Sequence, residues 1–337
     1  MNKTITPSNV QETIKKISVV MCTYNGEKYL REQLDSIVNQ TYPIHELLIQ
    51  DDCSTDHTTE IVREYAERYP FIRLNVNETQ AGINKNFFSA MRHSTGEYIA
   101  ISDQDDIWEP TKLETQIERI GDKLLCTGMS RPFSAEGISV AFDSRRPNYS
   151  LIRMLYVGML PGHTMLVHRS ILDMIPESTL TYDLQIQMAA ASMDSIEFVD
   201  DILVNQRRHT SAATLTKPVN RSFSFLNIFS MIKETLKLFI EIKPQMQQNF
   251  KTKETFLQQL RTPYRVKIVE SAIQMAHLQT QHSVASYLKL TLLCLKLRDH
   301  LFHVKDTHRV RAVLRALYFP IFGCHYFRYM SKDFKRV

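Results

Sequence analysis

Short apolar runs alternate with segments of helical periodicity up to about residue 130. Four apolar, β-branched runs each predict a buried strand, over residues 17–22, 47–49, 71–76 and 98–101. Between them apolar residues recur three or four positions apart, which predicts three helices: 30–38, 61–65 capped by Asp56, and 83–92. This alternation predicts right-handed βαβ units, and therefore an α/β fold with a mostly parallel sheet covered by helices.

Polar clusters follow three of the predicted strands. Residues 23–25 come after the first strand, 51–52 after the second and 103–106 after the fourth. In open parallel sheets, ligands bind beyond the carboxyl ends of the strands. We therefore expect these clusters to line one crevice.

The alternation stops beyond about residue 215. Apolar residues then recur on two helical faces, which predict a helical C-terminal region: Phe225, Ile228, Phe229, Ile232, Leu236, Phe239 and Ile240, then Val266, Val269, Ile273 and Ala276. Pro218, Pro244 and Pro263 are expected to break its segments. The predicted organisation is an N-terminal extension (1–16), an α/β domain (17–215) and a helical region with a basic tail (216–337).

The composition is that of a globular protein. The chain has 337 residues, of which 43% are hydrophobic and 23% charged. Its five cysteines are an odd number without C-x-x-C spacing, which argues against a disulfide framework and a structural zinc site and favours a reducing compartment, the cytoplasm. Residues 1–16 lack the apolar centre of a signal peptide, and no apolar run is long enough for a transmembrane helix.

The positive charge is concentrated at the C-terminus. From Thr291 onward ten lysines and arginines face three aspartates, whereas the whole chain carries only +5. Aromatic and aliphatic residues are interleaved with this charge: Leu314, Tyr318, Phe319, Ile321, Phe322, Tyr326 and Phe327. The pattern predicts peripheral docking on an anionic membrane surface, with ordinary helix packing or dimerisation as the alternative. No nucleic-acid partner is expected.

Three carboxylates crowd together after the fourth predicted strand. Asp103, Asp105 and Asp106 repel one another, so the cluster costs stability unless a cation lies there. Mg²⁺ binds through one or two protein carboxylates plus substrate phosphates, which suits this spacing. The sequence has neither the glycine-rich dinucleotide turn nor a P-loop, so a phosphate-bearing ligand would have to be held in another way. The alternative is an acidic loop that caps the next helix.

Six stretches in one order carry a resemblance to a known family: ISVVMCTYN (17–25), QDDCSTD (50–56), GINKNF (82–87), GEYIAISDQDDIWEPTK (96–112), PGHTMLV (161–167) and QRRH (206–209). Together they resemble the family 2 glycosyltransferases, and SDQDDIW is most similar to their rhamnosyltransferase-like branch. The resemblance implies a GT-A fold (a nucleotide-diphospho-sugar transferase fold). It also implies a nucleotide-diphosphate-sugar donor, a divalent metal (Mn²⁺ or Mg²⁺) and inverting transfer to an acceptor hydroxyl.

The resemblance also implies donor-binding residues. Tyr24, flanked by Thr23 and Asn25, matches the position that packs on the nucleotide base, and Asp52 matches the aspartate that hydrogen-bonds the base. Lys85 matches a basic position near the donor phosphates. The alternatives are a turn or helix cap for the Asp51–Asp52 pair and a solvated helix lysine for Lys85. Cys53 stands where the family more usually has glycine, so a different turn conformation is possible there.

The implied metal ligand is Asp105, the second aspartate of the D-x-D signature, with Asp103 as its companion near the ribose or the metal. His209 matches a histidine near the diphosphate or metal, and imidazole is a competent Mn²⁺ ligand. Arg207 and Arg208 would add positive charge for the leaving group, with Arg208 assigned to the donor. The alternative for His209 is a structural role. His163 and His168 lack comparable support.

Asp183 aligns with the catalytic base of the family, by its distance from PGHTMLV. The transfer needs a base because a hydroxyl is a poor nucleophile until a carboxylate takes its proton. Leu184 departs from the aromatic residue common at the next position, and Asp173 and Asp194 are nearby competitors. Trp108 either stacks on the sugar or plugs the space beneath the acidic loop.

The sequence therefore predicts an inverting glycosyltransferase. The expected acceptor is a bacterial surface polysaccharide or its lipid-linked precursor, and the favoured donor sugar is rhamnose from a dTDP donor, on branch resemblance only. Two alternatives stay open: a sugar-phosphate nucleotidyltransferase, which would be expected to carry a glycine-rich N-terminal loop unlike residues 21–27, and an inactive nucleotide-sugar-binding scaffold.

Overall fold

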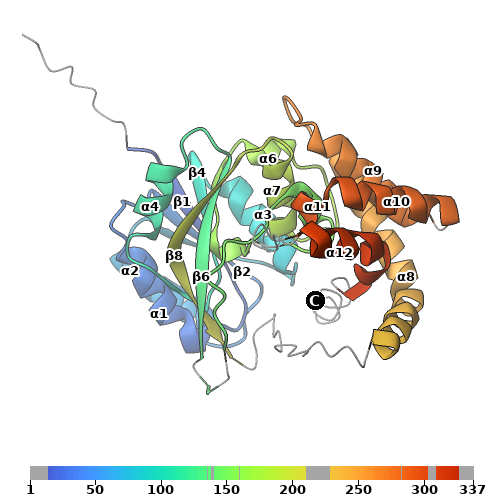
Figure 1. Cartoon of the computed structure of the whole chain (residues 1–337). Coiled ribbons are helices and arrows are strands. Elements are labelled where there is room, and N and C mark those ends of the chain that lie inside the picture. Colours follow the sequence, from blue (N-terminus) through green and yellow to red (C-terminus); the bar gives the residue numbers. More distant parts are fainter. Residues whose placement is uncertain are drawn as a thin grey trace, which may run out of the picture.

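A computed structural model describes residues 14–134, 136–137, 140–158, 160–209, 228–281, 283–302 and 309–325 (Figure 1). Its centre is an eight-stranded sheet of order β3-β2-β1-β4-β7-β6-β8-β5. The strands are β1 (Ile17–Thr23), β2 (Glu46–Asp51), β3 (Ile72–Val76), β4 (Tyr98–Ser102), β5 (Ile107–Trp108), β6 (Leu125–Ser134), β7 (Leu166–His168) and β8 (Ile196–Arg208). The accompanying helices are α1 (Glu27–Val38), α2 (Thr58–Arg68), α3 (Ile83–His93), α4 (Lys112–Arg119), α5 (Leu151–Met154), the 3₁₀ helix η1 (Gly162–Thr164), α6 (Ile171–Met174) and α7 (Tyr182–Ala191).

The four predicted strands form the parallel half of the sheet. β1 pairs in parallel with both β2 and β4, and β2 pairs in parallel with β3. Thr23 lies opposite Asp51, and Met21 lies opposite Ser102, so β1, β2 and β4 end at the same edge. The prediction that their polar clusters share one edge is confirmed.

The other half of the sheet is mixed. β7 runs antiparallel to β4 and β6, whereas β8 pairs in parallel with β6 and antiparallel with β5. The long ribbon of β6 and β8 carries a bulge between Gly128 and Ser130, and it extends past the edge where β1 and β2 end (Figure 1). This ribbon brings Arg207 and His209, at the end of β8, to the acidic loop formed by residues 103–106.

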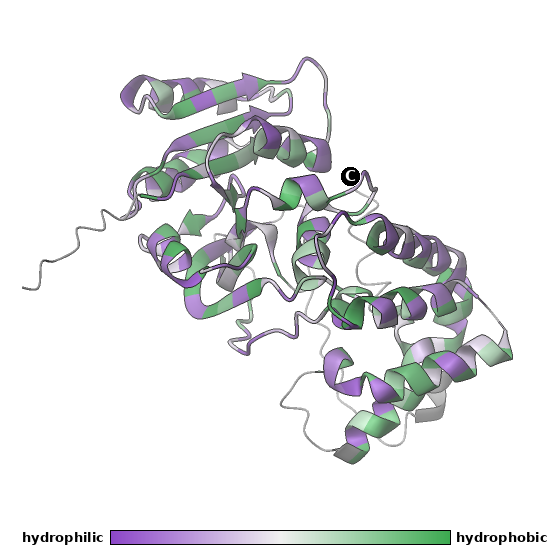
Figure 2. Cartoon of the chain, turned by 90° about the horizontal axis from the view of Figure 1, so that it is seen from above, coloured by the Kyte–Doolittle hydropathy of each residue, from purple (hydrophilic) through white to green (hydrophobic). Residues whose placement is uncertain are grey.

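Alternate residues of the central strands pack into two separate apolar clusters. Val19 and Met21 of β1 pack with α1, α2 and α4, while Val20 packs on the other face with α3 and α7. A strand buried on both faces needs apolar residues at every position, which explains the continuous runs in the sequence. Figure 2 shows apolar residues along the strands, and both apolar and polar residues on the surrounding helices.

The C-terminal region is helical, as predicted. Its helices are α8 (Ile228–Gln259), α9 (Ile268–Thr280), α10 (Val284–Lys296), α11 (Arg298–Leu301) and α12 (Arg309–Phe322). Pro263 lies between α8 and α9, but Pro244 lies inside α8, so the predicted break at Pro244 is wrong. Phe239 before Pro244 and Phe250 after it are both buried, and this packing outweighs the cost of about 3 kcal/mol for a helical proline. Pro218 lies outside the described residues.

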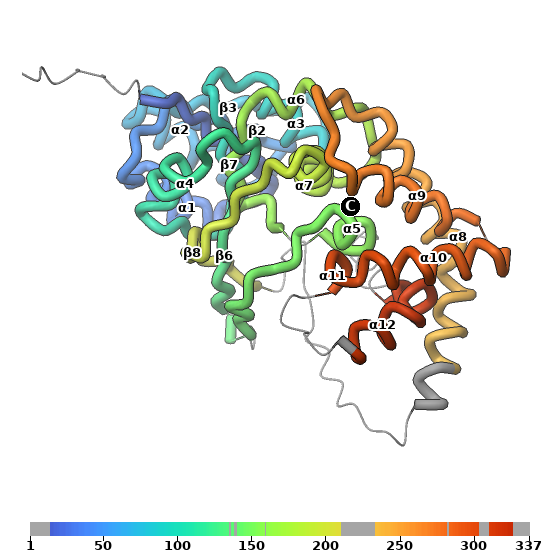
Figure 3. The backbone as a smooth tube through the Cα atoms, turned by 45° about the horizontal axis from the view of Figure 1, so that its top comes forward, coloured from blue at the N-terminus to red at the C-terminus, as the bar shows by residue number. Residues whose placement is uncertain are grey.

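The C-terminal helices share an apolar cluster with one face of the sheet (Figure 3). The Tyr156 ring next to α5 contacts Phe250 of α8 and Phe319 of α12 edge to face, with centroids 5.3 and 4.7 Å apart. On the predicted face of α8, Phe239 is buried whereas Leu236 and Ile240 are exposed. The boundary between residues 215 and 216, and the limit of the extension at residue 16, stay predictions.

No helix among the described residues is both long and apolar enough to span a membrane.

Candidate active site

The loops after β1 and β2 are tied together by hydrogen bonds. The Thr23 hydroxyl donates to the Asp51 carboxylate at 2.7 Å, and the Asp51 carboxylate also accepts from the backbone and hydroxyl of Ser54. The backbone N–H of Asn25, which has φ +48°, donates to the Ser54 hydroxyl at 2.9 Å. Thr23 is therefore buried in the scaffold, and Asn25 shapes the turn that presents Tyr24.

Tyr24 is held by its backbone and leaves its ring exposed. Its N–H donates to Gln104 Oε1 at 2.9 Å, and Gln104 Nε2 donates back to the Tyr24 carbonyl at 3.1 Å. A Cβ on Gly26 would stand 2.3 Å from that Gln104 oxygen, so only glycine allows this approach. The Tyr24 side chain is 47% exposed at the sheet edge, where an aromatic ring can stack on a ligand.

Asp52 is buried and anchors the loop that leads into α3. Its carboxylate accepts hydrogen bonds from Asn77 Nδ2 and from the backbone amides of Ala81 and Gly82, at 2.7 to 3.0 Å. Burial alone would raise the pKa of Asp52, but these hydrogen bonds outweigh it and lower the pKa below its ordinary value. The next residue, Cys53, has φ +65°, so it adopts the left-handed turn that glycine would favour.

Asp105 and His209 meet at the end of β8. His209 Nε2 lies 2.8 Å from Asp105 Oδ2, and both side chains are mostly buried. Burial, together with the neighbouring Asp103 carboxylate, raises the pKa of Asp105. The structure therefore brings together the two residues that the sequence assigns to a metal.

A second cluster joins Asp103 and Asp106 to His163. One ligand atom from each of these residues lies within 4.8 Å of the others, a spacing that could hold a metal ion. His163 Nδ1 is 3.1 Å from Asp103 Oδ2 and 3.4 Å from Asp106 Oδ2. Burial alone would lower the pKa of His163, but the two carboxylates outweigh it and raise the pKa. Burial raises the pKa of Asp106 to about 7.

The acidic loop fits a divalent cation. The buried Asp106 Oδ2 has no hydrogen-bond donor among the described residues, although His163 lies near it. Carboxylate oxygens are suitable ligands for both Mn²⁺ and Mg²⁺, and imidazole is a further ligand that transition metals bind. Asp103 and Asp105 are the accessible carboxylates, with 39% and 25% of their side chains exposed, whereas Asp106 and His163 lie behind them.

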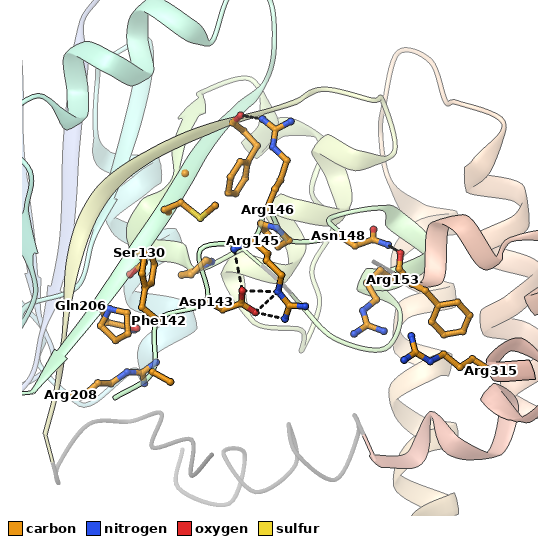
Figure 4. A pocket seen from close by; sticks show the side chains of 18 of the residues that line it. Ser130, Phe142, Asp143, Arg145, Arg146, Asn148, Arg153, Gln206, Arg208 and Arg315 are labelled. Carbon is orange, nitrogen blue, oxygen red and sulfur yellow. Dashed lines mark hydrogen bonds and ion pairs between the residues drawn. The ribbon is translucent and has the colours of Figure 1, made fainter. Parts of the chain in front are cut away.

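The two arginines before His209 have different positions. Arg207 is buried: its backbone N–H donates to Asp106, its Nε donates to the Asp105 carbonyl, and its guanidinium pairs with Glu32. It therefore holds the acidic loop in place. Arg208 is half-buried and lines a cavity together with Ser130 and Gln206 (Figure 4), and its assignment to the donor stays a prediction.

Asp183 lies in the first turn of α7, near the acidic loop. Burial raises its pKa, and the charge of Asp103 raises it further. Helix α7 is placed by Tyr182, whose ring stacks on Phe87 of α3 with centroids 4.1 Å apart. Lys85 is exposed in the first turn of α3, which follows the loop that Asp52 anchors. The competitor Asp173 is exposed on α6.

Trp108 is the predicted buried plug. It is 2% exposed and pairs with Val204 through β5, and the Lys112 Nζ lies 3.9 Å from its ring centroid. It therefore fixes the base of the acidic loop rather than contacting a sugar.

Sequence reasoning passed over His163, although it lies inside the quoted PGHTMLV stretch. The available sequence signal was that His163 lies within a stretch shared with the family, between the acidic loop and Asp183. Its role becomes visible only when β7 pairs with β4 and brings η1 beside the acidic loop. Residues from the end of β4, the start of β7 and the end of β8 therefore converge on one site.

This arrangement agrees with a comparison to known families. Residues 18–174 match the family model described as Glycosyl transferase family 2. These residues are thus similar to glycosyl transferase family 2. The matched stretch contains β1 to β7, the acidic loop and His163, while Asp183 and His209 follow it.

Curated relatives are similar to part of this chain. The protein Rv1520 of Mycobacterium tuberculosis is 32% identical over 207 residues, which are 57% of this chain and 59% of that protein. WfgD of Escherichia coli, named UDP-Glc:alpha-D-GlcNAc-diphosphoundecaprenol beta-1,3-glucosyltransferase, is 38% identical over 101 residues, 30% of this chain and 39% of that protein. The match thus spans less than two thirds of the length of these relatives.

Solved structures share the fold of this chain. TarS 1-349 of S. aureus in complex with UDP has a TM-score of 0.54 and 17% identity, covering 95% of this chain and 91% of that chain. The mannosyltransferase PcManGT from Pyrobaculum calidifontis, in complex with GDP-Man and Mn²⁺, has a TM-score of 0.50 and 17% identity, covering 96% and 88%. The expected GT-A fold is confirmed.

Proposed function

We propose that the protein is an inverting glycosyltransferase that moves a sugar from a nucleotide-diphosphate donor to a glycan hydroxyl. The observation that carries the proposal is the convergence of an exposed Tyr24 ring, the Asp103 and Asp105 carboxylates and Asp183 at one sheet edge. Thr23, Asn25 and Asp52 shape the proposed base-binding side of this edge. Lys85 is proposed to contact the donor phosphates.

A divalent ion, when bound, would supply positive charge to the departing diphosphate. Asp103 and Asp105 would hold it because they are the accessible carboxylates, and His209 lies against Asp105 as a further ligand. Asp106 and His163 would orient Asp103 from behind. The same groups could hold Mn²⁺ or Mg²⁺.

Asp183 is the proposed base for the acceptor hydroxyl. A raised pKa makes its carboxylate a stronger proton acceptor than a free aspartate, which suits general-base catalysis. The proton moves from the acceptor oxygen to Asp183 as that oxygen attacks the anomeric carbon, and the bond from this carbon to the donor diphosphate breaks. Attack opposite the leaving group inverts the anomeric configuration.

The proposed acceptor is a surface glycan or its lipid-linked precursor, by likeness to the relatives. WfgD is named for a diphosphoundecaprenol acceptor, while TarS and PcManGT were solved with UDP and GDP-Man. Rhamnose from a dTDP donor rests on the resemblance of the SDQDDIW motif. A nucleotidyltransferase and an inactive scaffold are the alternatives.

Binding of nucleoside diphosphates provides the first test. Of UDP, dTDP, GDP and ADP, at least one is expected to raise the melting temperature, and Mn²⁺ or Mg²⁺ is expected to increase the shift. At a ligand concentration about 100 times Kd, binding adds about 2.7 kcal/mol to the unfolding free energy. The measurement is a thermal-shift panel with each nucleotide and metal alone and together.

Nucleoside monophosphates serve as the matched control, because they retain the base and lose one phosphate. If no diphosphate shifts the melting temperature more than its monophosphate in the presence of metal, the proposed donor site is wrong.

The basic C-terminal region is proposed to dock on an anionic membrane. On α12, Val310, Leu314 and Leu317 are 71%, 54% and 48% exposed, so one helix carries an apolar stripe within the basic sequence. The predicted contributions of Tyr326 and Phe327 lie outside the described residues. The protein is expected to float with vesicles that contain phosphatidylglycerol and to release at high salt, because each basic residue contributes about 1 kcal/mol at low screening.

Vesicles of phosphatidylcholine alone are the control for this flotation assay. Leu314→Gln with Leu317→Gln should reduce flotation. Equal flotation on neutral and anionic vesicles would contradict electrostatic docking.

A further inference from the structure

Tyr182 is held at the start of α7 by contacts with α3. Its backbone N–H donates to Asn84 Oδ1 at 2.9 Å, and its ring stacks on Phe87 with centroids 4.1 Å apart. Only 7% of the residue is exposed. These contacts fix the backbone and the ring of Tyr182, and they leave its hydroxyl without an explanation.

The Tyr182 hydroxyl has no hydrogen-bond partner among the described residues. Three enclosed side-chain atoms in that part of the chain also lack a partner: Asp106 Oδ2, Trp108 Nε1 and Thr262 Oγ1. The Tyr182 hydroxyl is not one of these enclosed atoms, so it is not sealed from solvent. A mostly buried hydroxyl without a partner costs free energy, and phenylalanine would stack on Phe87 without that cost. The hydroxyl therefore indicates a ligand that supplies the missing oxygen.

Gly162 in η1 makes room for this hydroxyl. A Cβ at position 162 would stand 2.2 Å from the Tyr182 hydroxyl oxygen, so a larger residue would displace the end of the ring. The next residue, His163, contacts Asp103 and Asp106 through its Nδ1. The hydroxyl therefore lies against the segment that supports the acidic loop.

The Tyr182 hydroxyl is also near both charges that the proposed transfer uses. Burial raises the pKa of Tyr182, and the carboxylates of Asp103 and Asp183 are close enough to raise it further. The hydroxyl therefore keeps its proton and is a hydrogen-bond donor. Attack opposite the leaving group requires the anomeric carbon to lie between the diphosphate at Asp103 and the base Asp183. A group near both carboxylates therefore borders the sugar that is transferred.

We propose that the Tyr182 hydroxyl donates a hydrogen bond to a hydroxyl of the transferred sugar and so helps to select the donor sugar. This inference rests on the proposed glycosyltransferase function and deepens it, because it assigns a residue to the sugar itself. A sugar that places no oxygen at this point leaves the Tyr182 hydroxyl unpaired, which weakens its binding.

The test measures how much the sugar adds to donor binding. Calorimetry on the full chain with Mn²⁺ compares UDP, dTDP and GDP with UDP-glucose, UDP-N-acetylglucosamine, dTDP-rhamnose and GDP-mannose. Tyr182→Phe keeps the ring and removes only the hydroxyl. The sugar nucleotide that binds the wild type most tightly is expected to bind this variant about three- to tenfold more weakly, the effect of one hydrogen bond. The matching nucleoside diphosphate should bind both proteins equally, which also shows that the variant is folded.

Tyr65→Phe is the matched control for the loss of a tyrosine hydroxyl. Tyr65 is buried on α2, and its hydroxyl donates to Asp35 at 2.6 Å, so no ligand is needed to satisfy it. This variant should bind the sugar nucleotide as the wild type does.

Deoxy analogues of the tightest sugar nucleotide, each without one ring hydroxyl, identify the partner of Tyr182. One analogue should bind the wild type more weakly and show no further loss with Tyr182→Phe, because the two changes remove the same hydrogen bond. A further loss with every analogue would contradict a bond to a sugar hydroxyl.

Two other results would overturn the inference. One is equal binding of the sugar nucleotides to the wild type and to Tyr182→Phe. The other is an equal loss for the nucleoside diphosphate and its sugar nucleotide, which would assign the hydroxyl to the diphosphate. If the wild type binds the nucleoside diphosphate while either result is found, the sugar contact fails and the donor site stands. If the wild type binds no nucleoside diphosphate, the proposed function fails, and the sugar contact fails with it.

Discussion

Asp183→Asn is expected to lower turnover by about 10²- to 10⁴-fold, the range typical of a lost general base. Asparagine keeps the size of the side chain and cannot take the acceptor proton. Because Asp183 lies in the first turn of α7 and not in the proposed donor site, donor affinity should be nearly unchanged. Initial rates of transfer, together with calorimetric binding of the nucleoside diphosphate selected by the thermal-shift panel, measure both quantities.

The pH profile gives a second readout of the same variant. The base must be deprotonated, so wild-type turnover should fall as the pH drops through the pKa of Asp183. Burial raises this pKa, so the fall should begin at higher pH than for an exposed aspartate. The residual activity of Asp183→Asn should lack this acid limb.

Asp173→Asn is the matched control, because Asp173 is exposed on α6. It should retain most activity. If Asp173→Asn were inactive and Asp183→Asn active, the base would be Asp173. Near-normal turnover in both variants would show that neither is the base, while the fold and the donor site would stand.

Asp105→Ala is expected to abolish the effect of metal on donor binding. In the wild type, Mn²⁺ should tighten binding of the nucleoside diphosphate selected by the thermal-shift panel by about tenfold or more, because the cation lies between the acidic loop and the diphosphate. Without the Asp105 carboxylate, this metal effect should nearly vanish. Calorimetric titration of that nucleoside diphosphate with and without Mn²⁺ measures it.

Asp106→Asn is the matched control for the effect of Asp105→Ala on metal-dependent nucleotide binding. It removes the charge of the buried Asp106 and leaves Asp103 and Asp105 in place, so most of the metal effect should remain. If Asp106→Asn lost the metal effect and Asp105→Ala kept it, the ion would belong to the cluster of Asp103, Asp106 and His163 instead of the D-x-D pair.

The parallel half of the fold was predictable because its strands are buried on both faces. Such strands are continuously apolar, as in Ile17–Met21, and the polar residues after them mark their carboxyl ends. The β6–β8 ribbon was harder to predict, because half-exposed residues such as Ser130 and Gln206 interrupt its apolar pattern. The course of α8 through Pro244 was missed because tertiary packing on both sides overrides the local penalty.

The candidate site was predictable where it is contiguous in sequence. The crowding of Asp103, Asp105 and Asp106 predicted a cation, and the family resemblance assigned His209 to the diphosphate or metal. His163 and Tyr182 were missed, because their meaning depends on contacts between separate elements of the chain. Tyr182 and Gly162, for example, belong to α7 and η1, and only the packing of these elements brings the Tyr182 hydroxyl against Gly162.

The products formed from nucleotide sugars test the central claim most directly. The protein is incubated with Mn²⁺, a panel of UDP-, dTDP- and GDP-sugars and a bacterial lipid-linked glycan extract, and the nucleotides are separated by chromatography. The account predicts metal-dependent release of the nucleoside diphosphate from at least one donor, with the sugar recovered on the extract. No release from any donor, or formation of a nucleoside triphosphate when pyrophosphate is added, would contradict it.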